Sequence, residues 1–434
     1  MSLADKELFH SNFLAWLGLA DYTREYFLLV IEGLAGKKFS WHDDFLTNSA
    51  DYRVAREYNH FDLCILKRTT QSKELPLVVL ENKNKSISII TQLNGYKARV
   101  DELYKNEKND DEITFILLTL ITDFVDREKL EKENVWKVAS YADLFDSLSK
   151  VSGINWSCAN GMSLSYISEI DLLVEDYKRY VHRLSVFANS ISKVQDYNID
   201  TDIKSVLIDV RLESVYYKLL YSHYATCLAK KLKDYIVESN FAKNAGRKEF
   251  GVGTIFIDTG FTQKGGGAGI LDVAVKIDDN FVLKIQVQGN HYRHAIEWVG
   301  DKVEKKDRRI YTEADKEKLK DWINKISCIS KNGNLCFFRP LKQFKPCSVD
   351  FGGNKIFKDD TIYPTKEKKS NSSDEDLEGF NKFGPTFKYQ SRLIKDDEGL
   401  NNNEVIDNII CEIGKISKLD EIHTYAHRGD GSVS

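Results

Sequence analysis

Glu81 and Lys83 follow the apolar run LPLVVL at residues 75–80 and place a carboxylate and an amine two residues apart. Side chains of an extended strand alternate between its two faces, so both groups are expected on the same side. Asp62 interrupts an earlier apolar run, FDLCILK at residues 61–67, in the same way. If the two runs pair as antiparallel strands, two carboxylates and one ammonium group converge.

Neighbouring carboxylates repel each other, and in a partly buried site a divalent cation is the strongest available compensation. Oxygen ligands favour magnesium or manganese over zinc. Such an ion polarises a phosphodiester, while the Lys83 ammonium stabilises developing charge or orients water. The residues therefore predict metal-dependent phosphodiester hydrolysis with Asp62 and Glu81 as metal ligands, although Glu-x-Lys triplets also occur on solvated strand ends.

Three segments carry a resemblance to a known family: HFDLCI at 60–65, LPLVVLENKNK at 75–85 and TQLNGY at 91–96. Together they resemble the PD-(D/E)XK nuclease superfamily, whose core has an aspartate, then Glu-x-Lys on the next strand, then a helix. The resemblance implies catalytic roles for Asp62, Glu81, Lys83 and Gln92. Phe61 replaces the proline that gives the superfamily its name, but this departure removes no metal ligand.

The opening segment ELFHSNFLAWL at residues 7–17 is similar to the first helix of one bacterial branch of the superfamily. That similarity implies a fifth catalytic residue, Glu7, facing the site. Gln92 and Tyr96 are four residues apart, so on a helix they lie one above the other. The resemblance covers about residues 7–148.

Nucleic-acid contacts must come from local basic groups, because the 434-residue chain has a formal net charge of −4. Residues 51–100 hold nine Lys or Arg against five Asp or Glu. A solvated surface would explain any one of these basic groups equally well. The predicted nucleic-acid-binding residues are Arg53, Arg56, Lys85, Tyr96, Lys97 and Arg99.

The hydrophobic patterns predict an α/β fold: an N-terminal, restriction-endonuclease-like mixed sheet flanked by helices, then long helices and a C-terminal α+β unit. Two helices are expected between residues 5 and 34, and another over 91–104 between two strands. Long helices are expected over 164–191 and 203–239. We expect a nuclease-like domain at 1–152, a long-helix segment at 153–240 and a C-terminal domain of unknown role at 241–434.

A cytoplasmic location is expected, because no apolar run reaches the roughly 18 residues of a membrane span. The seven scattered cysteines contain no C-x-x-C pair and suit reduced thiols. The expected partner is nucleic acid, with DNA favoured, and no membrane; homo-oligomerisation is left open.

Two signals in the second half invite other interpretations. His291 and His294 form an H-x-x-H at an expected strand-to-helix junction, and a polar surface explains them better than a metal site. A weak similarity to the pattern of Asp62, Glu81 and Lys83 is also present, with Asp272 followed by Gln286 and Gln288. A duplicated core is one interpretation, and an independent β-rich recognition or dimerisation unit is the simpler one.

The favoured function is a magnesium- or manganese-dependent nuclease acting on DNA in a bacterial defence or restriction setting. The alternative is a catalytically inactive nucleic-acid-binding or scaffold protein on the same core. A hydrolase of small nucleotides is a third hypothesis.

Overall fold

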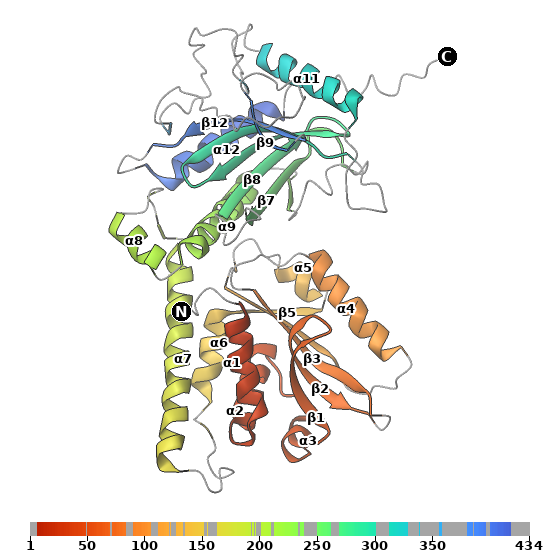
Figure 1. Cartoon of the computed structure of the whole chain (residues 1–434), viewed down its shortest axis with the longest axis vertical. Coiled ribbons are helices and arrows are strands. Elements are labelled where there is room, and N and C mark those ends of the chain that lie inside the picture. Colours follow the sequence, from red (N-terminus) through yellow and green to blue (C-terminus); the bar gives the residue numbers. More distant parts are fainter. Residues whose placement is uncertain are drawn as a thin grey trace, which may run out of the picture. The chain divides into compact units, whose positions relative to one another are not determined.

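The chain divides into two compact units, shown in Figure 1. The N-terminal unit comprises Met1–Lys193 and Val206–Leu219, and the C-terminal unit comprises Val194–Ser205 and Leu220–Ser434. The three-part division expected at residues 152 and 240 stays a prediction. The computed structural model describes residues 7–48, 50–69, 72–83, 90–105, 112–120, 122, 127–132, 135–151, 154, 163–191, 193–194, 196, 201–209, 212–232, 235–237, 250–261, 269–300, 312–328, 338, 356–357, 380–384, 386–395 and 400–417.

The N-terminal unit is built on a five-stranded sheet in the order β1-β2-β3-β4-β5. The antiparallel pairs β1–β2 and β2–β3 are followed by the parallel pairs β3–β4 and β4–β5. A parallel pair needs a crossover, and α4 (Ile90–Tyr104) supplies it between β3 and β4. The strands are β1 (Tyr52–Tyr58), β2 (Phe61–Arg68), β3 (Glu74–Lys83), β4 (Thr114–Thr119) and β5 (Trp136–Ser140).

Helices cover both faces of this sheet (Figure 1). The helices α1 (Glu7–Leu19), α2 (Asp21–Ala35) and α6 (Tyr141–Lys150) pack on one face, while α4 and α5 (Arg127–Lys132) pack on the other. The short α3 (His42–Thr47) precedes β1. The mixed α/β fold class is therefore confirmed, as are the helix break near Ala20 and the helix over 91–104.

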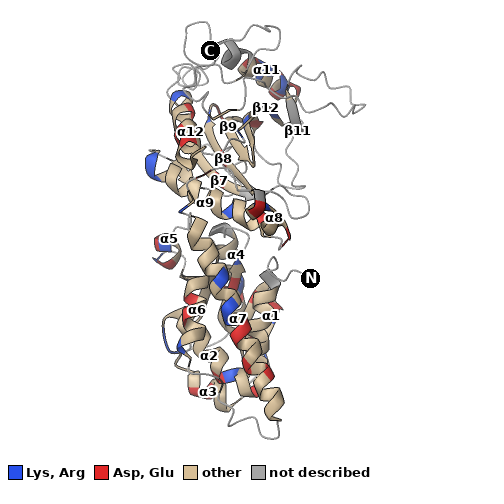
Figure 2. Cartoon of the chain, turned by 90° about the vertical axis from the view of Figure 1, so that its left-hand side faces the viewer, with Lys and Arg blue, Asp and Glu red and all other residues tan. Residues whose placement is uncertain are grey.

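The long helix α7 (Leu164–Ile191) packs against α6 and places Tyr177 on Phe13 of α1, with stacked rings 3.8 Å apart. It buries one stripe of side chains, Ile170, Val174, Tyr177, Val181 and Leu184. Lys, Arg, Asp and Glu residues lie between these buried positions, as the ribbon colours of α7 show in Figure 2, together with exposed apolar residues such as Leu172 and Leu173. This division of apolar and charged positions is typical of an amphipathic helix on a domain surface.

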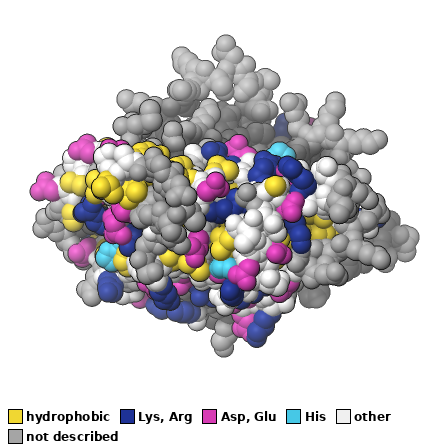
Figure 3. Space-filling view, turned by 90° about the horizontal axis from the view of Figure 1, so that it is seen from below, with side chains coloured by type: hydrophobic (Ala, Val, Ile, Leu, Met, Phe, Trp, Pro, Cys, Tyr) yellow, Lys and Arg dark blue, Asp and Glu magenta, His cyan; other side chains and the backbone are white. Residues whose placement is uncertain are grey.

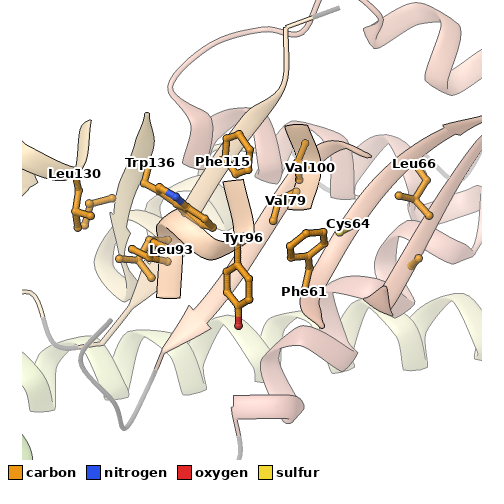
Figure 4. Close-up of a cluster of buried hydrophobic side chains, with 13 residues drawn as sticks. Phe61, Cys64, Leu66, Val79, Leu93, Tyr96, Val100, Phe115, Leu130 and Trp136 are labelled. Carbon is orange, nitrogen blue, oxygen red and sulfur yellow. The ribbon is translucent and has the colours of Figure 1, made fainter. Parts of the chain in front are cut away.

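The core between the sheet and α4 is a cluster of thirteen buried side chains (Figure 4). Tyr96 of α4 lies between Trp136 and Phe61 and directs its hydroxyl group out of the cluster. The ring centroids of Tyr96 and Phe61 are 5.4 Å apart, in an edge-to-face contact. This packing fixes the helix face that also carries Gln92.

The hairpin between β1 and β2 turns at Asn59 and His60, whose φ angles are 50° and 70°. Two consecutive positive φ values are typical of a type I′ turn, which suits the twist of a two-residue hairpin. Tyr58 and Phe61 pair across it. The turn therefore starts β2 at Phe61 and fixes Asp62 as its second residue.

The C-terminal unit contains a seven-stranded sheet in the order β11-β12-β10-β9-β8-β7-β6. All of its strand pairs are antiparallel except β6–β7. The strands are β6 (Tyr235–Val237), β7 (Ile255–Phe261), β8 (Gly269–Lys276), β9 (Phe281–Gln288), β10 (His291–Trp298), β11 (Asn381–Gly384) and β12 (Phe387–Leu393). Its helices include α11 (Glu313–Cys328) and α12 (Asn402–Ile416), while α8 (Thr201–Asp209) and α9 (Glu213–Lys231) contribute to both units.

The expected strand-to-helix junction at His291 and His294 is wrong, because both residues lie inside β10. They are three residues apart on a strand, so they project from opposite faces. His291 Nδ1 lies 3.3 Å from the Ser391 hydroxyl, and His294 Nε2 lies 3.1 Å from a Glu412 carboxylate oxygen. The two imidazoles therefore do not form one metal site.

A duplicated nuclease core in this unit is also contradicted by the topology. In the N-terminal sheet, the Glu-x-Lys strand is followed by a helical crossover to a parallel strand. The corresponding strand β9 instead turns back at Gly289 and pairs antiparallel with β10. Asp272 accepts a 3.0 Å hydrogen bond from Gln286 Nε2 and pairs with Lys284. The polar residues around Asp272 thus form a hydrogen-bonded network on an antiparallel sheet, not a second nuclease site.

None of the helices in the described ranges combines the length and the apolar character that a bilayer crossing requires.

Candidate active site

Glu81 and Lys83 project from the same face of β3, as strand alternation predicted. Lys83 Nζ lies 2.6 Å from Oε1 of Glu81, and both side chains are largely buried. They stand at the end of the central strand, whose residues 75–80 are buried between β2 and β4. The apolar run therefore fixes the backbone that carries the two charged groups.

Two side chains from α4 reach the same Glu81 oxygen. The Tyr96 hydroxyl donates to Oε1 across 3.2 Å, and Gln92 Nε2 lies 3.5 Å away. Gln92 Nε2 also donates to the Tyr96 hydroxyl oxygen over 2.7 Å. The i, i+4 spacing thus builds a short relay in which Gln92 orients Tyr96 and Tyr96 holds Glu81.

Asp62 meets β3 from the neighbouring strand. The antiparallel register pairs Leu63 with Leu80, so Asp62 comes opposite Glu81. Oδ2 of Asp62 accepts a 2.7 Å hydrogen bond from the backbone N–H of Asn82. The structure therefore brings Asp62, Glu81, Lys83, Gln92 and Tyr96 together at one site.

The electrostatics of this site are dominated by burial of Glu81. Burial raises the pKa of the Glu81 carboxyl to about 7, opposed by Lys83 and reinforced by the nearby Asp62 charge. Within the described part of the chain, Oε2 of Glu81 is buried without a hydrogen-bond partner. A buried, unpaired carboxylate oxygen is costly and is a site where a cation would bind favourably.

The donor set fits a hard divalent ion. Two carboxylates and no soft ligand point to magnesium or manganese, which usually keep several waters and take one or two protein carboxylates. Among the residues whose side chains are described, no group of three or more His, Cys, Asp or Glu side chains forms a metal-binding cluster. Asp62 and Glu81 are the two carboxylates that the described part of this site offers to such an ion.

Two predicted site residues lie outside the described side chains. Glu7 is the first residue of α1, but its side chain is not described, and Lys85 lies in a segment that the structure does not describe. Their predicted roles stay predictions.

The predicted phosphate-binding residues occupy two elements. Arg53 and Arg56 lie three residues apart on β1 and so project from opposite faces, while Lys97 and Arg99 lie on α4. Arg53 Nε donates to Glu74 over 2.9 Å, and a second Arg53 nitrogen contacts the same carboxylate. Arg99 donates to the Asn59 carbonyl over 3.3 Å and lies over the Tyr96 ring. Arg99 thus contacts Tyr96 of the site, and Lys97 is the next residue after Tyr96 on the same helix.

The surface charge is mixed. Figure 3 shows Lys and Arg side chains interspersed with Asp and Glu side chains on the face seen from below. This mixture agrees with the small net charge of the whole chain.

Sequence patterns did not identify the residues behind the site. Asn82 is fully buried on the opposite face of β3, where its Oδ1 accepts a 2.9 Å hydrogen bond from the Tyr141 hydroxyl. His10 lies against Tyr141 in an edge-to-face contact with ring centroids 4.9 Å apart. The signals that could have found them are the Asn inside Glu-x-Lys and the His in the apolar first helix.

Comparison with curated proteins and with solved structures gives no match to the chain. A family model does match its N-terminal part. Residues 1–168 match the model described as the PD-(D/E)XK nuclease superfamily, and this match confirms the family resemblance of the N-terminal part.

Proposed function

We propose that the N-terminal unit is a magnesium- or manganese-dependent nuclease that hydrolyses phosphodiester bonds, with DNA as its substrate. The observation that carries the proposal is the buried Oε2 of Glu81, which has no hydrogen-bond partner among the described residues and lies beside Asp62 and Lys83. The family match over residues 1–168 supports the same chemistry.

The roles follow from the contacts. Asp62 and Glu81 would hold the metal ion, which when bound would neutralise the two carboxylates and polarise a phosphate oxygen. Lys83 supplies an ammonium group next to this position, where it can stabilise charge developing on the phosphate or orient the attacking water. Tyr96 and Gln92 fix the Glu81 carboxylate through the hydrogen bonds of the α4 relay.

The test compares the wild-type chain with Asp62→Ala and Lys83→Ala on single-stranded DNA, double-stranded DNA and RNA, each with Mg²⁺, Mn²⁺ or a chelator. We expect cleavage of DNA by the wild type only with metal, and no cleavage by either variant. Asp101→Ala is the matched control, because Asp101 is an exposed carboxylate on α4. Circular dichroism and thermal melting check that the variants are folded.

Equal cleavage by the wild type and both variants would place the chemistry elsewhere. Binding of nucleic acid without cleavage under every condition would instead favour the catalytically inactive binding or scaffold protein. Hydrolysis of small nucleotides with polymers untouched would favour the third hypothesis.

The proposal includes a cytoplasmic, bacterial setting in defence or restriction, supported by the likeness of the opening helix to a bacterial branch. The three cysteines whose side chains are described, Cys64, Cys227 and Cys411, are free thiols, which suits a reducing compartment. Plating phage on cells that express the wild type or Asp62→Ala tests the defence role. Protection by the wild type alone is the expected result.

A further inference from the structure

Behind the carboxylates, a chain of contacts connects the first helix of the protein to Asp62. Oδ2 of Asp62 accepts a hydrogen bond from the backbone N–H of Asn82, 2.7 Å away. The peptide between Glu81 and Asn82 therefore lies directly against one proposed metal ligand and is continuous with the other. Movement of this peptide would shift both the Glu81 backbone and the N–H donor that holds Asp62.

The Asn82 side chain points away from the site and is anchored by α6. The Tyr141 hydroxyl donates to Oδ1 of Asn82 over 2.9 Å, and both side chains are almost fully buried. Tyr141 is the first residue of α6, whose start is fixed by a capping box at Ser140 and Asp143. The hydroxyl is thus presented to β3 from a well-defined helix end.

Tyr141 is in turn braced by α1. The His10 ring packs against it, and His10 Nδ1 lies 3.1 Å from the Tyr177 hydroxyl of α7. His10 also stacks on Tyr180 with centroids 5.7 Å apart. Burial lowers the pKa of His10 to about 3, so this imidazole is neutral at physiological pH and acts as a packed ring.

We propose that Tyr141 is a positioning residue that holds the Asn82 peptide, and through it Asp62 and Glu81, with His10 bracing the Tyr141 ring. The inference rests on the proposed function for its catalytic meaning. It extends that function to residues that do not touch metal or substrate. It also gives a structural role to two buried polar side chains, those of His10 and Asn82.

The test compares Tyr141→Phe with Tyr26→Phe. Both changes remove one hydroxyl from a buried tyrosine of the N-terminal unit, and each hydroxyl donates a 2.9 Å hydrogen bond, in Tyr26 to the Leu148 carbonyl. Tyr26→Phe is therefore the matched control for the general stability cost. The first readout is backbone amide hydrogen exchange at Asn82 in metal-free protein, which reports local opening.

We expect Tyr141→Phe to exchange at Asn82 at least about tenfold faster than Tyr26→Phe once differences in global stability are corrected. The second readout is Mn²⁺ affinity by calorimetry. Loss of a group that orients a metal ligand typically weakens metal binding by about 10- to 100-fold, and we expect about tenfold for Tyr141→Phe and no change for Tyr26→Phe. Equal exchange at Asn82 in the two variants would overturn the inference.

A double-mutant cycle tests whether Tyr141 acts through the Asn82 side chain. Asn82→Ala keeps the peptide N–H but removes the acceptor for Tyr141, so adding Tyr141→Phe should change exchange at residue 82 by less than about twofold. A further tenfold increase in exchange would show that Tyr141 does not act through the Asn82 side chain, and it would overturn the inference. If exchange behaves as expected but the wild type neither binds Mn²⁺ nor cleaves DNA, the positioning contact stands and the proposed function falls.

Discussion

Lys83 Nζ and Glu81 Oε1 are 2.6 Å apart on the same strand face, while the second oxygen of the Glu81 carboxylate is buried without a partner in the described structure. One half of this carboxylate is therefore saturated, by Lys83 and Tyr96. Among the described residues, nothing occupies the hydrogen-bonding positions of the other oxygen, where a cation would bind favourably. This asymmetry leads to measurable consequences.

The first prediction concerns Glu81 and pH. Because burial raises the pKa of this carboxyl to about 7, the folded protein binds the proton more tightly than the unfolded chain does. Its contribution to stability is complete below the ordinary value of 4.5 and is lost as the pH rises to about 7. Glu81→Gln should therefore raise the Tm of metal-free protein by a few degrees at pH 8, since each kcal/mol of added stability shifts the Tm by about 2–4 °C. At pH 5 the substitution should change the Tm little. A pH-independent difference in Tm would contradict the shifted pKa.

The second prediction concerns metal binding and stability. A ligand that binds only the folded state stabilises it by mass action, by about 2.7 kcal/mol when its concentration is 100 times Kd. Millimolar Mn²⁺ should therefore raise the Tm of the wild type at pH 8, and chelation should reverse the rise. Asp62→Asn should abolish the rise, whereas Asp101→Asn should retain it. Calorimetric scans with and without metal provide the measurement.

The third prediction compares the contributions of Arg53 and Lys97 to DNA binding. Arg53 makes two contacts with Glu74, so a phosphate would have to displace an existing ion pair, whereas Lys97 lies on α4 next to Tyr96. In the Asp62→Ala background, Lys97→Ala should weaken DNA binding and reduce the slope of log K against log salt by about one. Arg53→Ala should leave the slope unchanged. Fluorescence anisotropy at several salt concentrations measures both, and equal losses would count against the assignment.

The fourth prediction concerns the core that supports Tyr96. Trp136 is fully buried against Tyr96 and Phe115, so Trp136→Ala should cost about 3–5 kcal/mol of the free energy of unfolding. In the described structure its indole N–H has no acceptor, so Trp136→Phe loses no hydrogen bond. It should cost clearly less and keep Mn²⁺ binding. Chemical denaturation measures the free energies, and equal costs for the two variants would contradict this prediction.

The fifth prediction concerns Lys284 in the C-terminal unit. Burial lowers the pKa of this ammonium, but Asp272 and Glu297 together raise it above its ordinary value, so Lys284 stays charged. Lys284→Met would leave two carboxylates without their shared cation. The expected cost is about 3–5 kcal/mol, measured by denaturation. A triple change that also replaces Asp272 and Glu297 by Asn and Gln should recover most of it.

The strands and helices that position the site were predictable because local pattern and tertiary context agree. The run at 75–80 is apolar on both faces and is a central strand, and Gln92 and Tyr96 share a helix face as their spacing required. The shared face of Glu81 and Lys83 followed from strand alternation alone.

Other features depend on long-range contacts that no local pattern records. The pairing of Tyr141 with Asn82 joins residues 59 positions apart, and His10 meets Tyr177 across 167 positions. The strand that carries His291 and His294 is likewise defined by its pairing with β9 and β12 rather than by a local pattern.

The interleaved boundary between the units has a practical consequence for dissecting the protein. Val206–Leu219 belongs to the N-terminal unit although Val194–Ser205, which precedes it, belongs to the other. A chain that ends after Lys193 would therefore lack residues 206–219 of the N-terminal unit. A chain that starts at Leu220 would lack residues 194–205 of the C-terminal unit. Complementary fragments that overlap across 194–219 are the rational way to express each half separately.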